Sequence, residues 1–246
     1  MNLIEVEDLH VRYGDYEAVK GVSFSLAKGE ILGIVGESGS GKSTIAKTLM
    51  GLEKPSSGRI QVRCEGEGGK RSAVHLKPSP SPNIQMIFQD AVGSLNPRMT
   101  VRQTLTEVLK IKQSNNQTIK QLLDLVGLSS AILDQYPREM SGGQCQRVSI
   151  ARALACEPEV LIADEPVSAL DVSVQARVLN LLRDLRRDLG LSILLIAHDL
   201  AVVKNVCDRI CVMERGLFVD SGDAEDVFDH PTSAYTKRLL SAVPRI

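Results

Sequence analysis

The nine residues 36–44, Gly-Glu-Ser-Gly-Ser-Gly-Lys-Ser-Thr, decide the fold of this chain. An apolar run at 31–35 precedes them and is typical of a buried strand, and the segment 45–50 that follows is typical of a helix. Glycines at positions 36, 39 and 41 allow the backbone to curl so that its N–H groups converge, and the positive end of the helix dipole lies at the same point. The stretch therefore predicts a phosphate-binding loop between a strand and a helix.

Two side chains of this loop are suited to bind a nucleotide and its metal ion. Lys42 can reach the β- and γ-phosphates of a nucleotide, and the Ser43 hydroxyl can hold the magnesium ion that bridges them. The alternative, a Gly-Ser turn before an ordinary helix, requires a chance match to the whole pattern. We expect contacts to the nucleotide from every residue of the loop: Gly36, Glu37, Ser38, Gly39, Ser40, Gly41, Lys42, Ser43 and Thr44.

Composition excludes several classes of protein. The 246 residues are 43% hydrophobic, enough for one large domain or a domain with a subdomain, and the formal net charge is -1. Because basic residues are dispersed among acidic ones, we expect no nucleic-acid partner. No apolar stretch approaches the ~18 residues that span a bilayer, and the N-terminus is unlike a signal peptide, so we expect the chain in the cytosol. The five cysteines lack metal-binding spacing and are expected to be reduced thiols: Cys64, Cys145, Cys156, Cys207 and Cys211.

Strand-like and helical segments alternate along the chain. Strand-like segments occur near 4–11, 31–35, 60–63, 84–88, 160–163, 192–197 and 209–213. Apolar residues recur at helical spacing from Val174 to Leu189, before Gly190, and from Ile119 to Val126, before Gly127. This alternation predicts a mostly parallel sheet covered by helices.

Two long segments do not follow this alternation. Residues 64–82, rich in small and charged positions and then in prolines, are typical of a flexible surface excursion. No strand pattern is found from Thr100 to about Met140, which suggests an inserted helical subdomain. Since no internal repeat is present, we expect a single nucleotide domain.

Two further sequence elements complete the expected site. The apolar strand at 160–163 delivers Asp164 and Glu165 at its carboxyl end, where Asp164 can orient the magnesium shell and Glu165 can polarise a water. A plain strand-ending turn before Pro166 is the alternative. Ser141 and Gln144 have the spacing of a capping box, and the intervening glycines expose amides for a second phosphate contact; the two interpretations are compatible.

Six motifs, in this order, resemble those of the ATP-binding cassette ATPases. They are the phosphate loop, Gln89 after Ile87-Phe88, the stretch 140–144, the pair Asp164-Glu165, Ser168-Ala169-Leu170-Asp171, and His198 after Ile196-Ala197. The resemblance implies an α/β P-loop NTPase fold with a mostly parallel core sheet, an N-terminal antiparallel β subdomain and a helical subdomain at about 100–155. It also implies one domain over 1–246 with a short C-terminal helical tail at 223–246.

The resemblance also implies ATP as the nucleotide and gives roles to single residues. Gln89 matches the glutamine that senses magnesium and the γ-phosphate, and His198 matches the histidine that holds the γ-phosphate and the attacking water. Tyr13 resembles the aromatic residue that stacks on adenine, with Tyr16 as a less favoured substitute. The catalytic residues are then Glu165, His198 and Gln89, and the Mg²⁺ ligands, partly through water, are Ser43, Gln89 and Asp164. The residues expected to act on the ATP of a second chain are Ser141, Gly142, Gly143, Gln144 and Asp171.

Within that family the chain is similar to ATPase subunits of oligopeptide, dipeptide and nickel importers. The stretches that carry this similarity are 88–90, 94–101, 164–176 and 230–236. Three departures stand out. Met140 replaces the usual leucine, residues 64–82 replace a more regular basic stretch, and the chain ends at Ile246 without a longer extension that often bears cysteines. We therefore expect no iron–sulfur cluster.

The resemblance further implies partners. Two ATPase chains, identical or sisters, would close head to tail so that each ATP lies between Lys42 of one chain and Ser141 of the other. Two transmembrane permeases and, indirectly, an extracytoplasmic substrate-binding protein would complete the assembly at the cytoplasmic face of the membrane. We expect a permease to dock beside Gln89, on 91–100 and the helical segment that follows, where an ordered turn would present Leu95 and Arg98; a mere connector is the alternative.

Other functions match parts of this pattern. A non-transport ATPase of the same fold, serving phosphonate breakdown or iron–sulfur assembly, is the main alternative. A chromosome- or repair-type ATPase would need a long coiled-coil insertion or a basic face, and the sequence has neither. A binding module without hydrolysis is disfavoured because Glu165 and His198 are both intact.

Overall fold

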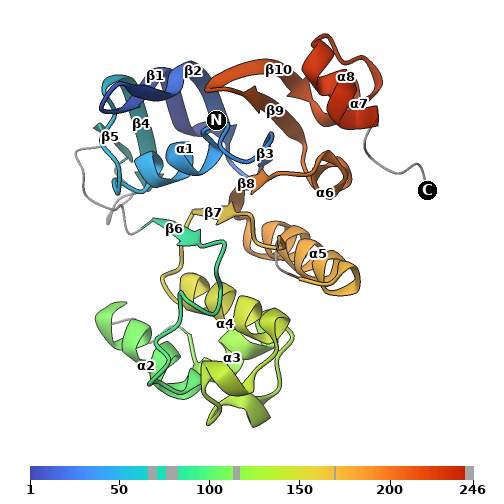
Figure 1. Ribbon diagram of the computed structural model, residues 1–246. Helices are drawn as coiled ribbons and strands as arrows, with labels where there is room; N and C mark the ends of the chain where they lie inside the picture. Colours follow the sequence, from blue (N-terminus) through green and yellow to red (C-terminus); the bar gives the residue numbers. More distant parts are fainter. Residues whose placement is uncertain (66–70, 76–82, 113–116, 169, 242–246) are drawn as a thin grey trace.

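The strands of the protein form two sheets (Figure 1), in a computed structural model that describes residues 1–65, 71–75, 83–112, 117–168 and 170–241. The antiparallel sheet has the order β2-β1-β4-β5 and contains β1 (Asn2–Tyr13), β2 (Tyr16–Ala27), β4 (Ser57–Glu65) and β5 (Arg71–His75). The core sheet has the order β10-β9-β3-β8-β7-β6 and contains β3 (Ile31–Val35), β6 (Ile84–Ile87), β7 (Val160–Asp164), β8 (Ser192–Ala197), β9 (Arg209–Glu214) and β10 (Leu217–Asp223).

The core sheet brings the expected site residues to one edge. Strands β9, β3, β8, β7 and β6 are parallel, and β10 pairs with β9 in the antiparallel direction. Val35 lies beside Ala197, and Asp164 lies beside Ile196, so the carboxyl ends of β3, β7 and β8 are level. Ligands of open α/β sheets bind at this edge, and the phosphate loop, Glu165 and His198 all follow these strands.

Successive side chains of β3 point into two different hydrophobic cores. Leu32 and Ile34 pack with the antiparallel sheet and with α1 (Lys42–Leu49), whereas Ile31 and Val35 pack with the helices on the other face. Every side chain of β3 is buried, which is why its sequence is continuously apolar rather than alternating.

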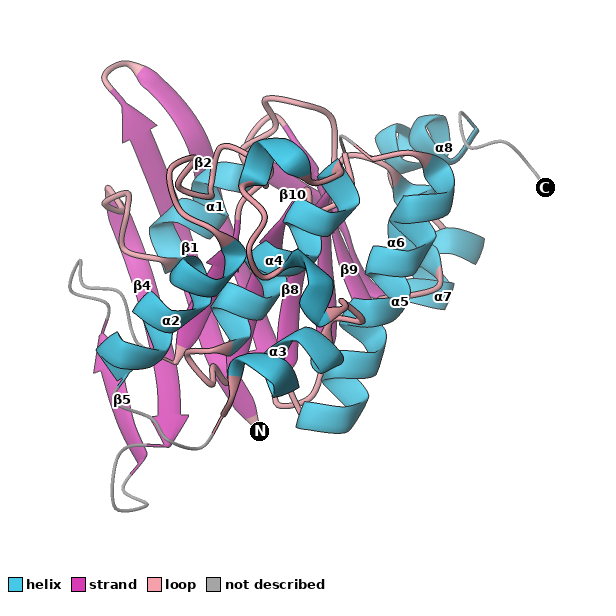
Figure 2. Cartoon of the chain, turned by 90° about the horizontal axis from the view of Figure 1, so that it is seen from below, coloured by secondary structure: helices cyan, strands magenta, loops and turns pink. Residues whose placement is uncertain are grey.

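The other helices form two groups. The helical subdomain contains α2 (Val101–Lys112), α3 (Ile119–Leu125), the 3-10 turns Ser130–Ile132 and Pro137–Glu139, and α4 (Gly142–Leu154). Figure 1 shows this group below β6 and β7, away from β1 and β2. The second group contains α5 (Val172–Leu189), α6 (Leu200–Lys204), α7 (Ala224–Asp229) and α8 (Ala234–Ser241), and α7 and α8 lie beside β10 (Figures 1 and 2).

Most of the predicted elements are confirmed. The described residues between 100 and 140 contain helices and no strand. Helix α5 ends at Gly190, whose φ of 66° is the left-handed conformation that favours glycine, and Gly127 has a φ of 63° after α3. The predicted α/β fold with a mostly parallel core sheet and an antiparallel N-terminal sheet is confirmed.

Three strands were not predicted. In β2 a register break near Gly21, with φ of 79°, interrupts the alternation of buried Val19, Val22, Phe24 and Leu26. In β10 the apolar residues are confined to the short run 217–219 and only Asp220 is buried, so the strand has no alternating apolar pattern. The expected excursion 64–82 is wrong for Arg71–His75, which pairs with β4 as β5; residues 66–70 and 76–82 lie outside the described part of the chain.

The expectations about membranes and thiols can be checked on the described residues. None of the helices there is long and apolar enough to cross a bilayer. Cys145, Cys156, Cys207 and Cys211 are free thiols, and burial raises the pKa of Cys211 to about 12. The side chain of Cys64 lies outside the described set.

Candidate functional site

The phosphate loop connects β3 to α1, and two of its glycines are required for different reasons. Gly41 is the N-cap of α1 and has a φ of 111°, a conformation that a side chain disfavours. Gly36 is required by a close approach instead, because a Cβ there would lie 2.1 Å from the carbonyl oxygen of Met213. The loop therefore lies tightly against β9 as well as curling around its own centre.

Lys42 points back into the loop. Its side chain is 3% exposed, and its Nζ donates hydrogen bonds to the carbonyls of Gly36, at 2.7 Å, and Glu37, at 2.9 Å. Burial lowers the pKa of this ammonium group, while the nearby carboxylates of Glu165 and Asp164 act in the opposite direction. The ammonium is thus held at the centre of the loop by two backbone carbonyls, which a phosphate group can replace.

Ser43 and Asp164 meet beside Lys42. The Ser43 hydroxyl donates to Asp164 Oδ1 at 2.9 Å, which joins the start of α1 to the end of β7. Burial raises the pKa of Asp164, and the hydrogen bond from Ser43 acts to lower it. Two oxygen atoms that can serve as metal ligands thus lie next to each other at the edge of the sheet.

Glu165 is the point at which the remaining side chains converge. Gln89 Nε2 donates to Glu165 Oε2 at 3.0 Å, His198 Nδ1 lies 3.5 Å from the same oxygen, and Lys42 Nζ lies 4.0 Å from Oε1. Glu165 has a φ of 45°, a conformation that costs a non-glycine residue about 1–3 kcal/mol and that clusters at functional sites. Its backbone N–H donates to the Ile196 carbonyl at 3.0 Å, which fixes the turn against β8.

These residues line one cavity of about 480 Å³. Tyr13 and Tyr16 also line it, with 44% and 60% of their surface exposed, so both aromatic rings are accessible to an adenine. The cavity lining contains the following residues predicted for ATP: Tyr13, Glu37, Ser38, Gly39, Gly41, Lys42, Ser43, Thr44, Gln89, Glu165 and His198. Asp164 adjoins it through Ser43, whereas Gly36 and Ser40 do not line it.

The second expected phosphate contact lies apart from this cavity. The capping box at the start of α4 is confirmed, since Gln144 N donates to Ser141 Oγ at 3.3 Å and Ser141 N donates to Gln144 Oε1 at 2.8 Å. None of the residues 141–144 lines the cavity of the phosphate loop. Gly142 lines a neighbouring groove with Ser43 and Asp164, and Asp171 is the exposed N-cap residue of α5.

A glycine is needed at position 143 for a structural reason that the sequence did not reveal. A Cβ at this position would lie 2.5 Å from Cγ1 of Val174 in α5, whereas a Cβ at Gly142 would meet Leu170 Cδ2 at 3.4 Å, an acceptable contact. The close approach of α4 to α5 thus requires a glycine at 143 whatever its role in phosphate binding.

The turn at 91–100 differs from the expectation in one respect. Arg98 is exposed, but Leu95 is 2% exposed and packs in the core, so the prediction that the turn presents Leu95 is wrong. The Ser94 hydroxyl forms a hydrogen bond of 3.0 Å with Ser149 in α4, and Ser94 O accepts from Arg152. Leucine is buried here because the turn packs onto the helical subdomain.

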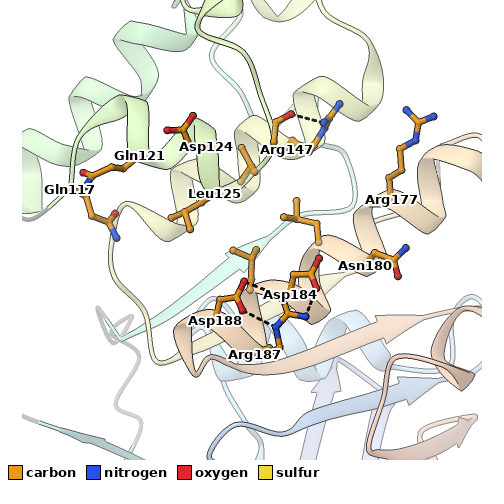
Figure 3. Close-up of a pocket in the computed structure, with 14 residues that line it drawn as sticks. Gln117, Gln121, Asp124, Leu125, Arg147, Arg177, Asn180, Asp184, Arg187 and Asp188 are labelled. Atoms are coloured by element: carbon orange, nitrogen blue, oxygen red, sulfur yellow. Dashed lines mark hydrogen bonds and ion pairs between the residues drawn. The ribbon is translucent and has the colours of Figure 1, made fainter.

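A larger cavity of about 890 Å³ lies between α3, α4 and α5. Figure 3 shows Arg147 and Arg177 on one side of it and the paired Asp184, Arg187 and Asp188 on another. None of the residues predicted for nucleotide binding lines this cavity. We therefore place the candidate site at the phosphate loop, although its cavity is the smaller of the two.

Known sequences are similar to nearly the whole chain. OppF of Lactococcus lactis subsp. lactis, an oligopeptide transport ATP-binding protein, is 48% identical over 234 residues, 93% of this chain and 73% of that protein. AppF of Bacillus subtilis, of the same description, is 47% identical over 238 residues, 95% of this chain and 72% of that protein.

Solved structures agree with the fold. The chain matches cbiO1 of Clostridium perfringens, part of the ABC transporter complex cbiONQ, with a TM-score of 0.76 and 28% identity over 93% of this chain and 91% of that one. It matches MJ0796, a bacterial ABC transporter cassette with a dimeric structure, with a TM-score of 0.75 and 26% identity over 90% of this chain and 98% of that one. The model of the ABC transporter family matches residues 19–168. Together with the Ser43–Asp164 pair and Glu165 beside the phosphate loop, these matches show that the chain belongs to the ABC transporter family, as an ATP-hydrolysing cassette.

Proposed function

We propose that this chain is the ATPase subunit of an importer for oligopeptides. The relatives described above are named oligopeptide transport ATP-binding proteins and align with almost all of the chain. Nickel, the other cargo suggested by the sequence, has no support from these relatives. In this proposal two permeases hold the chain at the cytoplasmic face of the membrane, and an extracytoplasmic peptide-binding protein delivers the cargo.

The observation that carries the proposal is the convergence of Lys42, Gln89 and His198 on the carboxylate of Glu165. Glu165 follows directly after Asp164, and both lie beside the phosphate loop. A carboxylate in this position can accept a proton from a water that attacks the γ-phosphate. Gln89 and His198 fix the orientation of the carboxylate, and Lys42 stabilises the charge of the phosphates.

Ser43 and Asp164 are suited to the Mg²⁺ ion that accompanies ATP. Mg²⁺ prefers hard oxygen ligands and keeps several waters, and the Ser43 hydroxyl and Asp164 carboxylate provide two such oxygens 2.9 Å apart. Gln89 donates through its nitrogen to Glu165, which leaves its amide oxygen free as a further ligand. When bound, the ion neutralises charge on the β- and γ-phosphates.

The start of α4 would complete the site of a second ATPase chain, identical or a sister. Ser141 and Gly142 are exposed, and neither lines the cavity of the phosphate loop. The N-terminus of a helix attracts phosphate because its backbone amides point outward and carry the positive end of the helix dipole. We therefore propose head-to-tail closure of two cassettes, with Ser141, Gly142, Gly143, Gln144 and Asp171 acting across the interface.

The exposed turn around Arg98 is the proposed contact to a permease. It begins two residues after Gln89, and its Ser94 is joined to α4 by hydrogen bonds to Ser149 and Arg152. A movement of Gln89 on binding the γ-phosphate would therefore be passed to the turn and to the helical subdomain. A cysteine at Arg98 that cross-links to a permease loop would support this contact, and its failure to cross-link in an active transporter would contradict it.

Uptake measurements test the function as a whole. Cells that lack this chain are complemented with wild-type protein or with Glu165→Gln, and uptake of a labelled oligopeptide and of labelled nickel is followed. We expect the wild type to restore peptide uptake alone and Glu165→Gln to restore neither. Restoration of nickel uptake would change the proposed cargo, and full peptide uptake with Glu165→Gln would contradict the role of ATP hydrolysis.

A further inference from the structure

A contact between the C-terminal helix and the phosphate loop is not explained by the roles given above. The backbone N–H of Glu37 donates a hydrogen bond of 2.9 Å to the hydroxyl oxygen of Tyr235, in α8, across 198 residues of sequence. Tyr235 is 5% exposed, so the hydroxyl is held in place by packing. The tail of the chain thus touches the loop beside the nucleotide cavity, in a neighbouring pocket that Tyr235 lines with Glu37 and Ser40.

The peptide group that Tyr235 contacts is the same one that Lys42 contacts. The Glu37 N–H and the Gly36 carbonyl belong to one planar peptide unit. Tyr235 accepts from the N–H at 2.9 Å, and Lys42 Nζ donates to the carbonyl at 2.7 Å. Because the two groups of a trans peptide point in opposite directions, a hydroxyl that fixes the N–H also fixes the direction of the carbonyl.

The position of Tyr235 is itself set by a buried anchor. Asp220 in β10 accepts hydrogen bonds from Thr232 N at 3.3 Å, from the Thr232 hydroxyl and from Ser233 N at 3.0 Å. Ser233 Oγ in turn accepts from Tyr235 N at 3.1 Å. The start of α8 is therefore tied to the core sheet before the ring of Tyr235 reaches the loop.

Arg238 covers the ring on its outer side. Its guanidinium carbon lies 5.2 Å from the ring centroid of Tyr235, and Nη2 lies 3.9 Å from Oε1 of Glu37 and 3.9 Å from Oε1 of Glu214. A cation above an aromatic face is attracted to the ring and stabilises its position. The ring, the hydroxyl and the neighbouring arginine thus make one assembly against the first two residues of the loop.

We propose that Tyr235 is a positioning residue of the phosphate loop, whose hydroxyl holds the Gly36–Glu37 peptide so that its carbonyl faces Lys42. The inference rests on the proposed function, in which Lys42 binds the nucleotide phosphates. With the peptide held, Lys42 keeps one position before the nucleotide binds, and phosphate replaces the carbonyls without a conformational change of the loop. Without the hydroxyl, the peptide is free to rotate, and ordering it on ATP binding lowers the affinity.

The variant Tyr235→Phe removes only the hydroxyl. A single hydrogen bond contributes a net difference that corresponds to about a 2- to 10-fold weaker Kd for ATP. We expect KM for ATP to rise by the same factor while kcat changes less than about 2-fold, because Glu165, Gln89 and His198 are untouched. Equilibrium titration with a fluorescent ATP analogue and steady-state ATPase assays measure both.

Two controls separate positioning from general weakening of the tail. Tyr136→Phe makes the same change at a part-buried tyrosine of the helical subdomain that also has an arginine over its ring, Arg138 at 5.6 Å, and it should leave Kd unchanged. Ser241→Ala removes a hydrogen bond of α8 itself, from Ser241 Oγ to the Arg238 carbonyl at 2.7 Å, and should affect Tm but not Kd. Amide exchange at Glu37 gives a readout independent of activity and should accelerate only in Tyr235→Phe.

The outcomes are distinguishable. A raised Kd with faster exchange at Glu37 in Tyr235→Phe alone supports the inference. A wild-type Kd and wild-type exchange at Glu37 would overturn it, whatever happens to Tm or kcat, and so would an equal rise in Kd for Ser241→Ala. If Lys42→Ala binds ATP as tightly as the wild type, the proposed nucleotide site itself is wrong.

Discussion

The phosphate loop and the start of α4 both place backbone amides at a helix N-terminus, but they differ in what surrounds them. Around the loop, Lys42 and Glu165 line one cavity that Asp164 adjoins through Ser43, and their contacts are made within this chain. At the start of α4, Ser141 is satisfied by the capping box and is exposed, and no residue from 141 to 144 lines that cavity. The comparison teaches that the two helix starts have different surroundings, and in the proposed function the start of α4 acts on the ATP of a second chain.

The largest expected effect is on ATP turnover, at Glu165 beside the phosphate loop. Glu165→Gln should lower ATP turnover by ~10²- to 10⁴-fold, the range for loss of a positioned general base, while ATP binding is kept. Steady-state ATPase assays and a titration with an ATP analogue measure the two quantities. A variant that keeps more than about a third of the wild-type rate, in a preparation whose wild type is active, would contradict the role of Glu165.

The next effect concerns binding rather than turnover. Lys42→Ala removes charge-assisted hydrogen bonds to the phosphates from a buried position, and we expect a Kd for ATP about 10- to 100-fold weaker. Lys110→Ala, on the exposed side of α2, is the control and should bind as the wild type does. Unchanged affinity in Lys42→Ala would mean that the loop is not the nucleotide site.

A pair of glycine variants sharpens the comparison at the start of α4. Gly143→Ala should cost about 1–3 kcal/mol of unfolding free energy through its clash with Val174 Cγ1, and Gly142→Ala should cost much less. Adding Val174→Ala should relieve part of the cost at position 143, since the two residues are in contact. Denaturant unfolding measures these differences.

ATPase activity of the same variants then separates packing from phosphate contact. If Gly143 serves packing alone, the double variant recovers activity together with stability. Gly142→Ala meets only Leu170 within this chain, so a folded Gly142→Ala protein with low activity would indicate a contact made to another chain. Full activity in both variants would argue against a phosphate contact at the start of α4.

The sequence predicted the chemistry of the site better than its surroundings. The phosphate loop, Asp164-Glu165, Gln89 and His198 lie in short motifs next to strand ends, and a parallel sheet brings such ends together. The reason for Gly36 was not predictable, because it depends on the Met213 carbonyl in a strand almost 180 residues away. The same is true of Gly143 with Val174, of buried Leu95, and of Tyr235 with Glu37, since each depends on packing between distant segments.

The strands that were missed have a local explanation. Apolar alternation identifies a strand only while its register is regular, and the breaks in β1 and β2 near Gly21 shift the buried positions. Strand β10 lies at the edge of the sheet, and Asp220 is its only buried residue. Its Asp220 binds the start of the C-terminal tail instead of packing in the core.

The central claim is that the start of α4 completes the site of a second cassette, and light scattering of Glu165→Gln protein tests it most directly. The single chain has a mass of 26.7 kDa. At saturating ATP we expect the variant to double in mass, alone or with the ATPase chain that co-purifies with it, and to return to the single mass when ATP is removed. Adding Ser141→Arg should prevent the doubling while ATP binding by the single chain is kept. The claim would be contradicted if Glu165→Gln protein kept the mass of a single chain at saturating ATP, both alone and with the co-purifying ATPase chain. It would also be contradicted if the variant with both Glu165→Gln and Ser141→Arg still doubled in mass.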